Sequence, residues 1–103
     1  MDRLQALKDI LTQDPANAFA RYGLAMELSH RGETDNAMVE FQTLIKINPD
    51  YTAGYFMAAQ TLSRAGRNDE AKQLLRDGIS TARRTSDHHA ESEMQGMLDE
   101  LGG

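Results

Sequence analysis

Residues 18–51 read AFARYGLAMELSHRGETDNAMVEFQTLIKINPDY, and residues 52–85 read TAGYFMAAQTLSRAGRNDEAKQLLRDGISTARRT. Each stretch is 34 residues long, and identical residues recur at equivalent positions. The identical pairs are Ala25 and Ala59, Leu28 and Leu62, Ser29 and Ser63, Gly32 and Gly66, Asp35 and Asp69, Ala37 and Ala71, and Ile45 and Ile79. A fixed period of this size indicates stacked repeats, each of them one supersecondary unit.

Each repeat is predicted to contain two helices with a glycine between them. Apolar residues recur with helical spacing on both sides of Gly32. The glycine is expected to end the first helix, and Pro49 the second, because proline disfavours a helical residue before it. Thr34 and Asn68 are the predicted N-caps of the second helices, since short polar side chains satisfy free backbone N–H groups there.

Alanines stand where the two helices of each repeat are expected to cross. Ala25 pairs with Ala37 in the first repeat, and Ala59 with Ala71 in the second. Methyl side chains let two helix backbones approach closely. A larger residue at Ala37 would overpack this crossing, which typically costs about 1–3 kcal/mol.

Further apolar and small residues complete a family pattern. They are Leu24, Ala25, Leu28, Gly32, Ala37, Phe41 and Pro49 in the first copy, and Tyr55, Ala58, Ala59, Leu62, Gly66, Ala71 and Leu75 in the second. These residues resemble the tetratricopeptide repeat family, from which the chain departs at Arg21, Gly78 and Arg83. The resemblance implies an all-α fold, a right-handed α-α superhelix of stacked helical hairpins with about six helices.

The chain is predicted to form a single domain over residues 1–103. A chain of this length buries enough surface for one compact unit. Its expected parts are a half repeat at 1–15, a first repeat at 18–51, a second repeat at 52–85 and a C-terminal capping helix at 86–103.

The N-terminal residues continue the helical pattern. Pro15 lies 34 residues before Pro49, and in this register Leu7, Ile10 and Leu11 align with apolar residues of the first repeat. Residues 2–13 therefore resemble the second helix of a half repeat.

The C-terminal helix is expected to pack through an apolar stripe and to expose an acidic outer face, as terminal repeats need a polar outside. The strict 34-residue register does not hold in this helix, so we predict that the repeat pattern is shifted by one to three residues after Ile79. The last connector is expected at residues 83–86. The stripe contains Ala90, Met94, Met97, Leu98 and Leu101.

Composition excludes several classes of function. The 16 acidic and 11 basic residues give a formal net charge of −5. A sequence-independent nucleic-acid binder normally carries a basic surplus, so no nucleic-acid partner is expected. The chain has no cysteine and no apolar run long enough for a membrane span, which favours a cytoplasmic protein that does not contact a membrane.

No catalytic motif is present, so the sequence predicts no enzyme and no cofactor. His88 and His89, close to Glu91 and Glu93, form one cluster of ligand-like residues. Adjacent histidines point about 100° apart on a helix, so one face offers too few ligands for a metal ion. We interpret the cluster as the exposed first turn of the capping helix and expect no metal site.

The family resemblance implies a concave groove lined by the first helices of successive repeats. Independently, Phe19, Tyr22 and Met26 form a second apolar ridge beside the core stripe, which suggests an exposed patch for a partner. The alternative is that the terminal helices cover these side chains. The predicted groove residues are Phe19, Tyr22, Met26, Ser29, His30, Ala53, Phe56, Gln60, Ser63 and Arg64.

These features predict non-catalytic protein–protein recognition. The expected partner is an apolar peptide or helix, with an acidic end placed near His30 and Arg64. A self-associating homodimer, with the groove occupied by the acidic terminal helix of a second copy, is the alternative.

Overall fold

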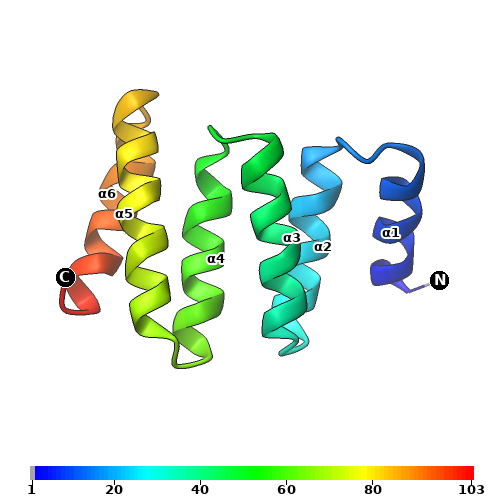
Figure 1. Cartoon of the computed structure of the whole chain (residues 1–103), viewed down its shortest axis with the longest axis horizontal. Helices are drawn as coiled ribbons and strands as arrows, with labels where there is room; N and C mark the ends of the chain where they lie inside the picture. Colours follow the sequence, from blue (N-terminus) through cyan, green and yellow to red (C-terminus); the bar gives the residue numbers. More distant parts are fainter. Residues whose placement is uncertain (1) are drawn as a thin grey trace.

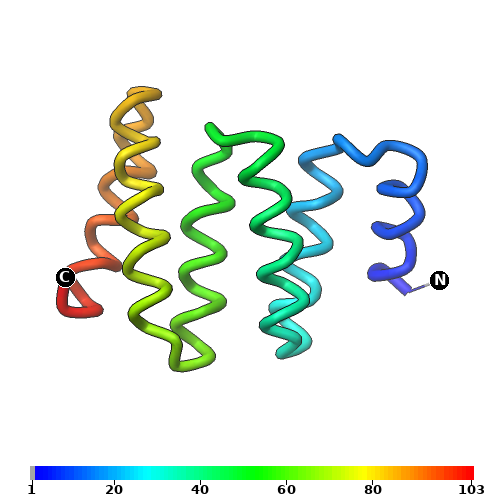
Figure 2. Tube along the Cα trace, viewed as in Figure 1, coloured from blue at the N-terminus to red at the C-terminus, as the bar shows by residue number. Residues whose placement is uncertain are grey.

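The computed structural model describes residues 2–103, which form six α-helices and, within that range, no strand. The helices stand side by side along a body of 40 × 29 × 18 Å, with the two termini at opposite ends (Figures 1 and 2). The predicted all-α helical-hairpin fold is confirmed. The helices are α1 (Arg3–Gln13), α2 (Ala18–His30), α3 (Thr34–Ile47), α4 (Thr52–Arg64), α5 (Asn68–Arg84) and α6 (His88–Glu100).

The helices form two layers. Besides packing on its neighbours in sequence, α4 contacts both α2 and α6 directly. Within residues 2–103, α1, α3 and α5 contact only the helices next to them in sequence and never one another. The first helices of successive repeats therefore form one continuous layer, and the second helices are spread over its other side.

Glycines end the first helices, as predicted. Gly32 and Gly66 adopt left-handed φ angles of 77° and 79°, which favour glycine. The next N–H in the chain bonds back to the last turn in each case, at 3.0 Å from Glu33 to the Leu28 carbonyl and at 2.9 Å from Arg67 to that of Leu62.

The prediction that Thr34 and Asn68 are N-caps is wrong. Each is the first residue of its helix, and Glu33 and Arg67 hold the N-cap positions without a side-chain cap bond. The physical reason is the tightness of the turn. The residue after the glycine closes the preceding helix and also holds the N-cap position of the following one, so Thr34 and Asn68 already lie inside their helices.

The four alanines predicted at the helix crossings are all fully buried. They lie in the pairs α2–α3 and α4–α5, which pack closely as small residues allow. The largest fully buried side chains belong to Phe41, Leu44, Leu62, Leu75 and Met94.

The N-terminal helix packs less completely than predicted. Leu7 and Leu11 are buried, whereas Ile10, which aligns with the fully buried Leu44 of the first repeat, is 45% exposed. Within residues 2–103, α1 contacts α2 and no other helix. The side of α1 that carries Ile10 therefore has no neighbouring helix to cover it.

The last connector lies later than predicted. Helix α5 continues through Arg83 to Arg84, so these two residues are helical and the link to α6 is 85–87. Helix α6 begins 36 residues after the start of α4, two more than the period, which lies within the predicted shift. Ser86 takes the left-handed conformation that glycine supplies at the other two turns, with φ at 59°.

Two departures from the family pattern have structural reasons. The Arg21 guanidinium lies 2.6 Å from the Glu40 carboxylate on α3, so a charged pair joins the two helices where a large apolar residue is usual. Gly78 is buried on α5, and a Cβ added there would lie 2.7 Å from the Tyr55 Cβ and against the Met94 sulfur. The absence of a side chain lets α5 approach both α4 and α6.

We predict opposite effects for two glycine-to-alanine substitutions. Gly78→Ala gains helix propensity of about 1 kcal/mol but overpacks the interior by about 1–3 kcal/mol, so it should lower the free energy of unfolding. Gly96→Ala on α6 should raise it by about 0.5–1 kcal/mol, because an added Cβ meets no described atom within 4 Å. Urea denaturation followed by circular dichroism measures both, and a stabilising Gly78→Ala would contradict the packing described here.

Candidate functional site: a groove across the first-helix layer

A hollow of about 300 Å³ lies where α2, α4 and α6 meet. Its lining combines aromatic and apolar side chains from α2 and α4 with polar and acidic side chains of α6 and its N-cap. The residues are Tyr22, Thr52, Ala53, Phe56, Met57, Asp87, His89, Ala90 and Glu93. Tyr22 and Phe56 occupy equivalent positions of the two repeats, so the repeat places two aromatic rings in one hollow.

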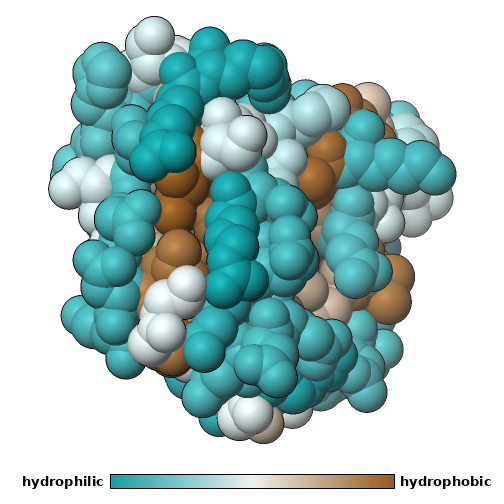
Figure 3. Space-filling view, turned by 60° about the vertical axis from the view of Figure 1, so that its left-hand side comes forward, coloured by the Kyte–Doolittle hydropathy of each residue, from teal (hydrophilic) through white to brown (hydrophobic). Residues whose placement is uncertain are grey.

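A second hollow of about 380 Å³ continues the first along α4 and α6. The two share Phe56 and Glu93, so together they form one groove, which we call the α4–α6 groove. The second hollow is lined by Phe56, Gln60, Ser92, Glu93, Gly96, Met97 and Glu100. On the face seen in Figure 3, apolar surface lies in narrow strips between polar ridges.

Tyr22 is held in place by a second aromatic ring. Its ring centroid lies 5.6 Å from that of Tyr51, with the planes tilted by 51°. Burial, and to a smaller extent Tyr51, raises the pKa of the Tyr22 phenol. The side chain is therefore neutral at physiological pH and presents an apolar ring with a hydroxyl group.

Asp87 fixes α6 against α4 at the head of the groove. Its carboxylate accepts hydrogen bonds from the Ala90 N–H at 3.1 Å and from the Thr52 hydroxyl at 2.9 Å. The first bond caps α6 and the second ties it to the first residue of α4. These bonds, chiefly the one from Ala90, lower the pKa of the Asp87 carboxyl.

The charges that border the groove are mainly negative. Glu93 and Glu100 lie on α6, and within residues 2–103 no Lys or Arg lines either hollow. His89 lies 3.2 Å from Glu93 and its side chain is 87% exposed. Among the residues that the structure describes, no group of three His, Asp or Glu side chains could hold a metal ion.

The structure brings together four of the predicted groove residues: Tyr22, Ala53, Phe56 and Gln60. Phe19 is 81% exposed at the start of α2 and lies outside the two hollows.

The remaining predicted residues lie elsewhere on the first helices. The hydroxyl group of Ser29 lies 2.7 Å from that of Thr61 and joins α2 to α4, so it is used inside the fold. Met26 and Ser63 are half-buried. His30 and Arg64 are exposed at the C-terminal ends of their helices and line neither hollow.

The residues that sequence reasoning missed come mostly from α6. Because the 34-residue period is shifted by two residues before this helix, the repeat pattern could not predict which of its side chains face α4. One usable signal was Asp87, an aspartate directly before an apolar stripe and so a candidate N-cap. The missed residues that line the groove are Thr52, Met57, Asp87, His89, Ala90, Ser92, Glu93, Gly96, Met97 and Glu100.

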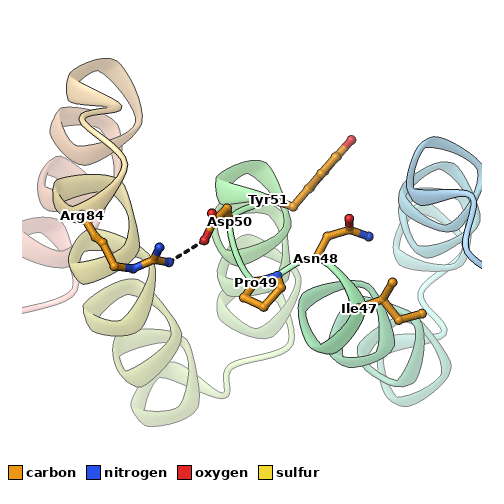
Figure 4. A pocket seen from close by; sticks show the side chains of 6 residues that line it. All are labelled: Ile47, Asn48, Pro49, Asp50, Tyr51 and Arg84. Atoms are coloured by element: carbon orange, nitrogen blue, oxygen red, sulfur yellow. Dashed lines mark hydrogen bonds and ion pairs between the residues drawn. The ribbon is translucent and has the colours of Figure 1, made fainter.

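A wider hollow of about 650 Å³ lies beside the α3–α4 connection (Figure 4). Arg84 reaches across it from the end of α5 and forms an ion pair with Asp50. The two charges are satisfied by each other, and the rest of the lining comes from one short segment, 47–51. It offers less for a ligand than the groove does, although it is larger.

The family comparison agrees with the fold. The family model described as tetratricopeptide repeat matches residues 28–90. The chain therefore belongs to the tetratricopeptide repeat family, whose members are generally non-catalytic modules for protein–protein interaction.

Individual relatives extend this similarity over nearly the whole chain. A tetratricopeptide repeat-containing protein of Pseudomonas aeruginosa is 29% identical over 98 residues, covering 95% of this chain and 93% of its own length. A tetratricopeptide repeat domain protein from Salinibacter ruber is 29% identical with a TM-score of 0.79, covering 86% of this chain and 90% of that one. A Bordetella parapertussis protein has the same fold at 22% identity, with a TM-score of 0.84 and coverage of 98% and 88%.

In the part of the chain that the structure describes, no helix has the length and apolar character needed to cross a membrane.

We predict that Asp87 stabilises the fold in a pH-dependent way. Its pKa is lower in the folded chain than in the unfolded one, so its contribution is complete at neutral pH and is lost as pH falls through the folded pKa. Asp87→Ala should therefore unfold at lower urea concentration than wild type at pH 7, and the difference should shrink below about pH 4.

Asp87→Asn is the matched variant, because an amide oxygen still accepts the capping bond but does not titrate in this range. At pH 7, the urea concentration that unfolds Asp87→Asn should lie between those that unfold wild type and Asp87→Ala. If wild type and Asp87→Ala differ in their unfolding urea concentration by the same amount at pH 7 and at pH 3, this role of Asp87 is contradicted.

Proposed function

We propose that this chain binds a peptide or helix of another protein across its first-helix layer. Apolar side chains of the partner would lie on Tyr22 and Phe56, with Phe19 and Met26 extending the contact along α2. An amphipathic helix in a groove is a common mode of peptide recognition. With only two full repeats the groove is short, so we expect affinity of about micromolar strength.

The observation that carries this proposal is the pair of aromatic rings in one hollow. Tyr22 and Phe56 are half-buried against the core, yet both line the same 300 Å³ space together with Met57. The terminal helices do not cover them completely. Helix α6 forms one wall of the hollow and leaves its floor open. Large aromatic side chains in a pocket are typical of residues that dominate binding energy.

Self-association through the acidic terminal helix is the weaker alternative. The apolar side of α6 is already used within its own chain, where Met94 is fully buried and Leu98 nearly so. The remaining carboxylates of a second copy's α6 would also meet Glu93 and Glu100 of the groove, and like charges repel. We therefore expect light scattering to give the 11.5 kDa mass of a monomer.

We predict that Tyr22→Ala/Phe56→Ala weakens partner binding by at least about tenfold, since both rings are removed from the contact. The measurement is a pull-down from lysate of the source organism, quantified by mass spectrometry, after circular dichroism shows that each protein is folded. Val39→Ala/Ile47→Ala is the matched control, because these side chains are 56% and 46% exposed on α3 and lie outside the groove. It should retain the partner.

Ala53→Gln provides a second test that spares the core. Ala53 is exposed and lines the first hollow, so a longer polar side chain should obstruct the groove without disturbing buried residues. A partner recovered equally by wild type, Tyr22→Ala/Phe56→Ala and Ala53→Gln would contradict the proposed function.

A further inference from the structure

The four carboxylates of α6, those of Glu91, Glu93, Asp99 and Glu100, differ in their surroundings. Glu91 lies toward α5, where the Arg83 guanidinium approaches it to 2.6 Å. Glu93 and Glu100 line the groove, and Glu100 has no ion-pair partner within residues 2–103. Glu91 is therefore paired on the α5 side, Asp99 accepts a hydrogen bond from the uncharged Gln95 side chain at 3.0 Å, and Glu93 and Glu100 place negative charge along the groove.

The nearby arginines do not reach the groove. Arg76 donates a hydrogen bond to the Gly103 carbonyl at 3.0 Å, and Arg84 pairs with Asp50 across the α3–α4 connection. Two bases remain beside the groove. His89 lies 3.2 Å from Glu93 and is largely exposed. Arg64, at the end of α4, donates a hydrogen bond to the Gln60 carbonyl at 3.5 Å and forms no ion pair with Glu93 or Glu100 within residues 2–103. An apolar floor with Tyr22 and Phe56 thus borders a wall that carries Glu93 and Glu100.

We propose that the peptide bound in the α4–α6 groove carries Lys or Arg residues beside its apolar anchors, with those cations against Glu93 and Glu100. The inference rests on the proposed function and adds the chemistry of the partner. Charge complementarity carries it, because a cation next to the α6 wall gains attraction and an acidic residue there is repelled. It differs from the sequence-based expectation of an acidic end, since His30 and Arg64 line neither hollow.

The aromatic floor favours the same partner. A guanidinium or ammonium group near the Tyr22 or Phe56 ring is attracted by the face of the ring as well as by the carboxylates. Each exposed carboxylate–cation contact should change affinity by about twofold to fivefold. Removal of both carboxylates should therefore weaken binding by about fourfold to twenty-fivefold.

The test is selection from a random 15-residue peptide library displayed on phage, against the immobilised wild-type chain at pH 8, where histidine is ordinarily uncharged. We expect the enriched peptides to combine apolar residues with an excess of Lys and Arg. The most enriched peptide is then synthesised, and its Kd is measured by fluorescence anisotropy at 50 mM and 300 mM NaCl. Affinity should fall at the higher salt concentration.

Glu93→Gln/Glu100→Gln should raise the Kd of this peptide by the factor expected for the loss of both carboxylates, and the Kd should depend less on salt concentration. Asp69→Asn/Asp77→Asn is the matched control, because it removes the same charge from exposed positions on α5. It should bind as wild type does. Equal loss in both double variants would show an effect of net charge alone and would overturn the inference.

The outcomes separate this inference from the proposed function. Enriched peptides that need Tyr22 and Phe56 but show no basic excess, or bind Glu93→Gln/Glu100→Gln unchanged, overturn the inference and leave the proposed function standing. Failure of wild type to enrich any peptide, or enrichment that survives Tyr22→Ala/Phe56→Ala, overturns both.

Discussion

The close approach of the two helices in each repeat is the constraint on which the rest of this structure depends. Ala25, Ala37, Ala59 and Ala71 are fully buried, and side chains this small let paired helices pack with little space between their backbones. Because the same arrangement recurs after 34 residues, α2 and α4 come to lie in one layer and in contact. A larger side chain at the helix crossing of either repeat would tilt one helical hairpin against the next. The hollow between their first helices would then change.

Helix α6 completes this layer although it follows a longer α5. Gly78 gives it room, since any side chain there would meet Met94 and Tyr55. Asp87 then sets its start against Thr52 of α4. The groove is thus built from two kinds of contribution. The repeats supply the aromatic floor through Tyr22 and Phe56, and the terminal helix supplies a wall that carries the carboxylates of Glu93 and Glu100.

Most of the fold could be predicted from the sequence because period, glycine breaks and alanine crossings are local or strictly periodic signals. The aromatic pair of the groove followed from the same period. Features that depend on contacts between distant residues could not be predicted in this way. The exposure of Ile10 reflects a missing neighbour, the role of Ser29 depends on Thr61 in the next repeat, and the α6 wall depends on a shift of two residues. The incorrect N-caps at Thr34 and Asn68 arose because the preference for a residue type was weighed without the geometry of the preceding turn.

The proposed binding face is the layer formed by α2, α4 and α6. The most direct measurement is NMR chemical-shift mapping of the ¹⁵N-labelled wild-type chain during titration with the peptide most enriched by phage selection. If the peptide binds across this layer, the perturbed amides will cluster around Tyr22, Phe56, Gln60 and Glu93, while those on the exposed sides of α3 and α5 will stay unchanged. Perturbations centred on α3 and α5, or on the hollow beside Arg84, would instead place the binding face elsewhere on the molecule.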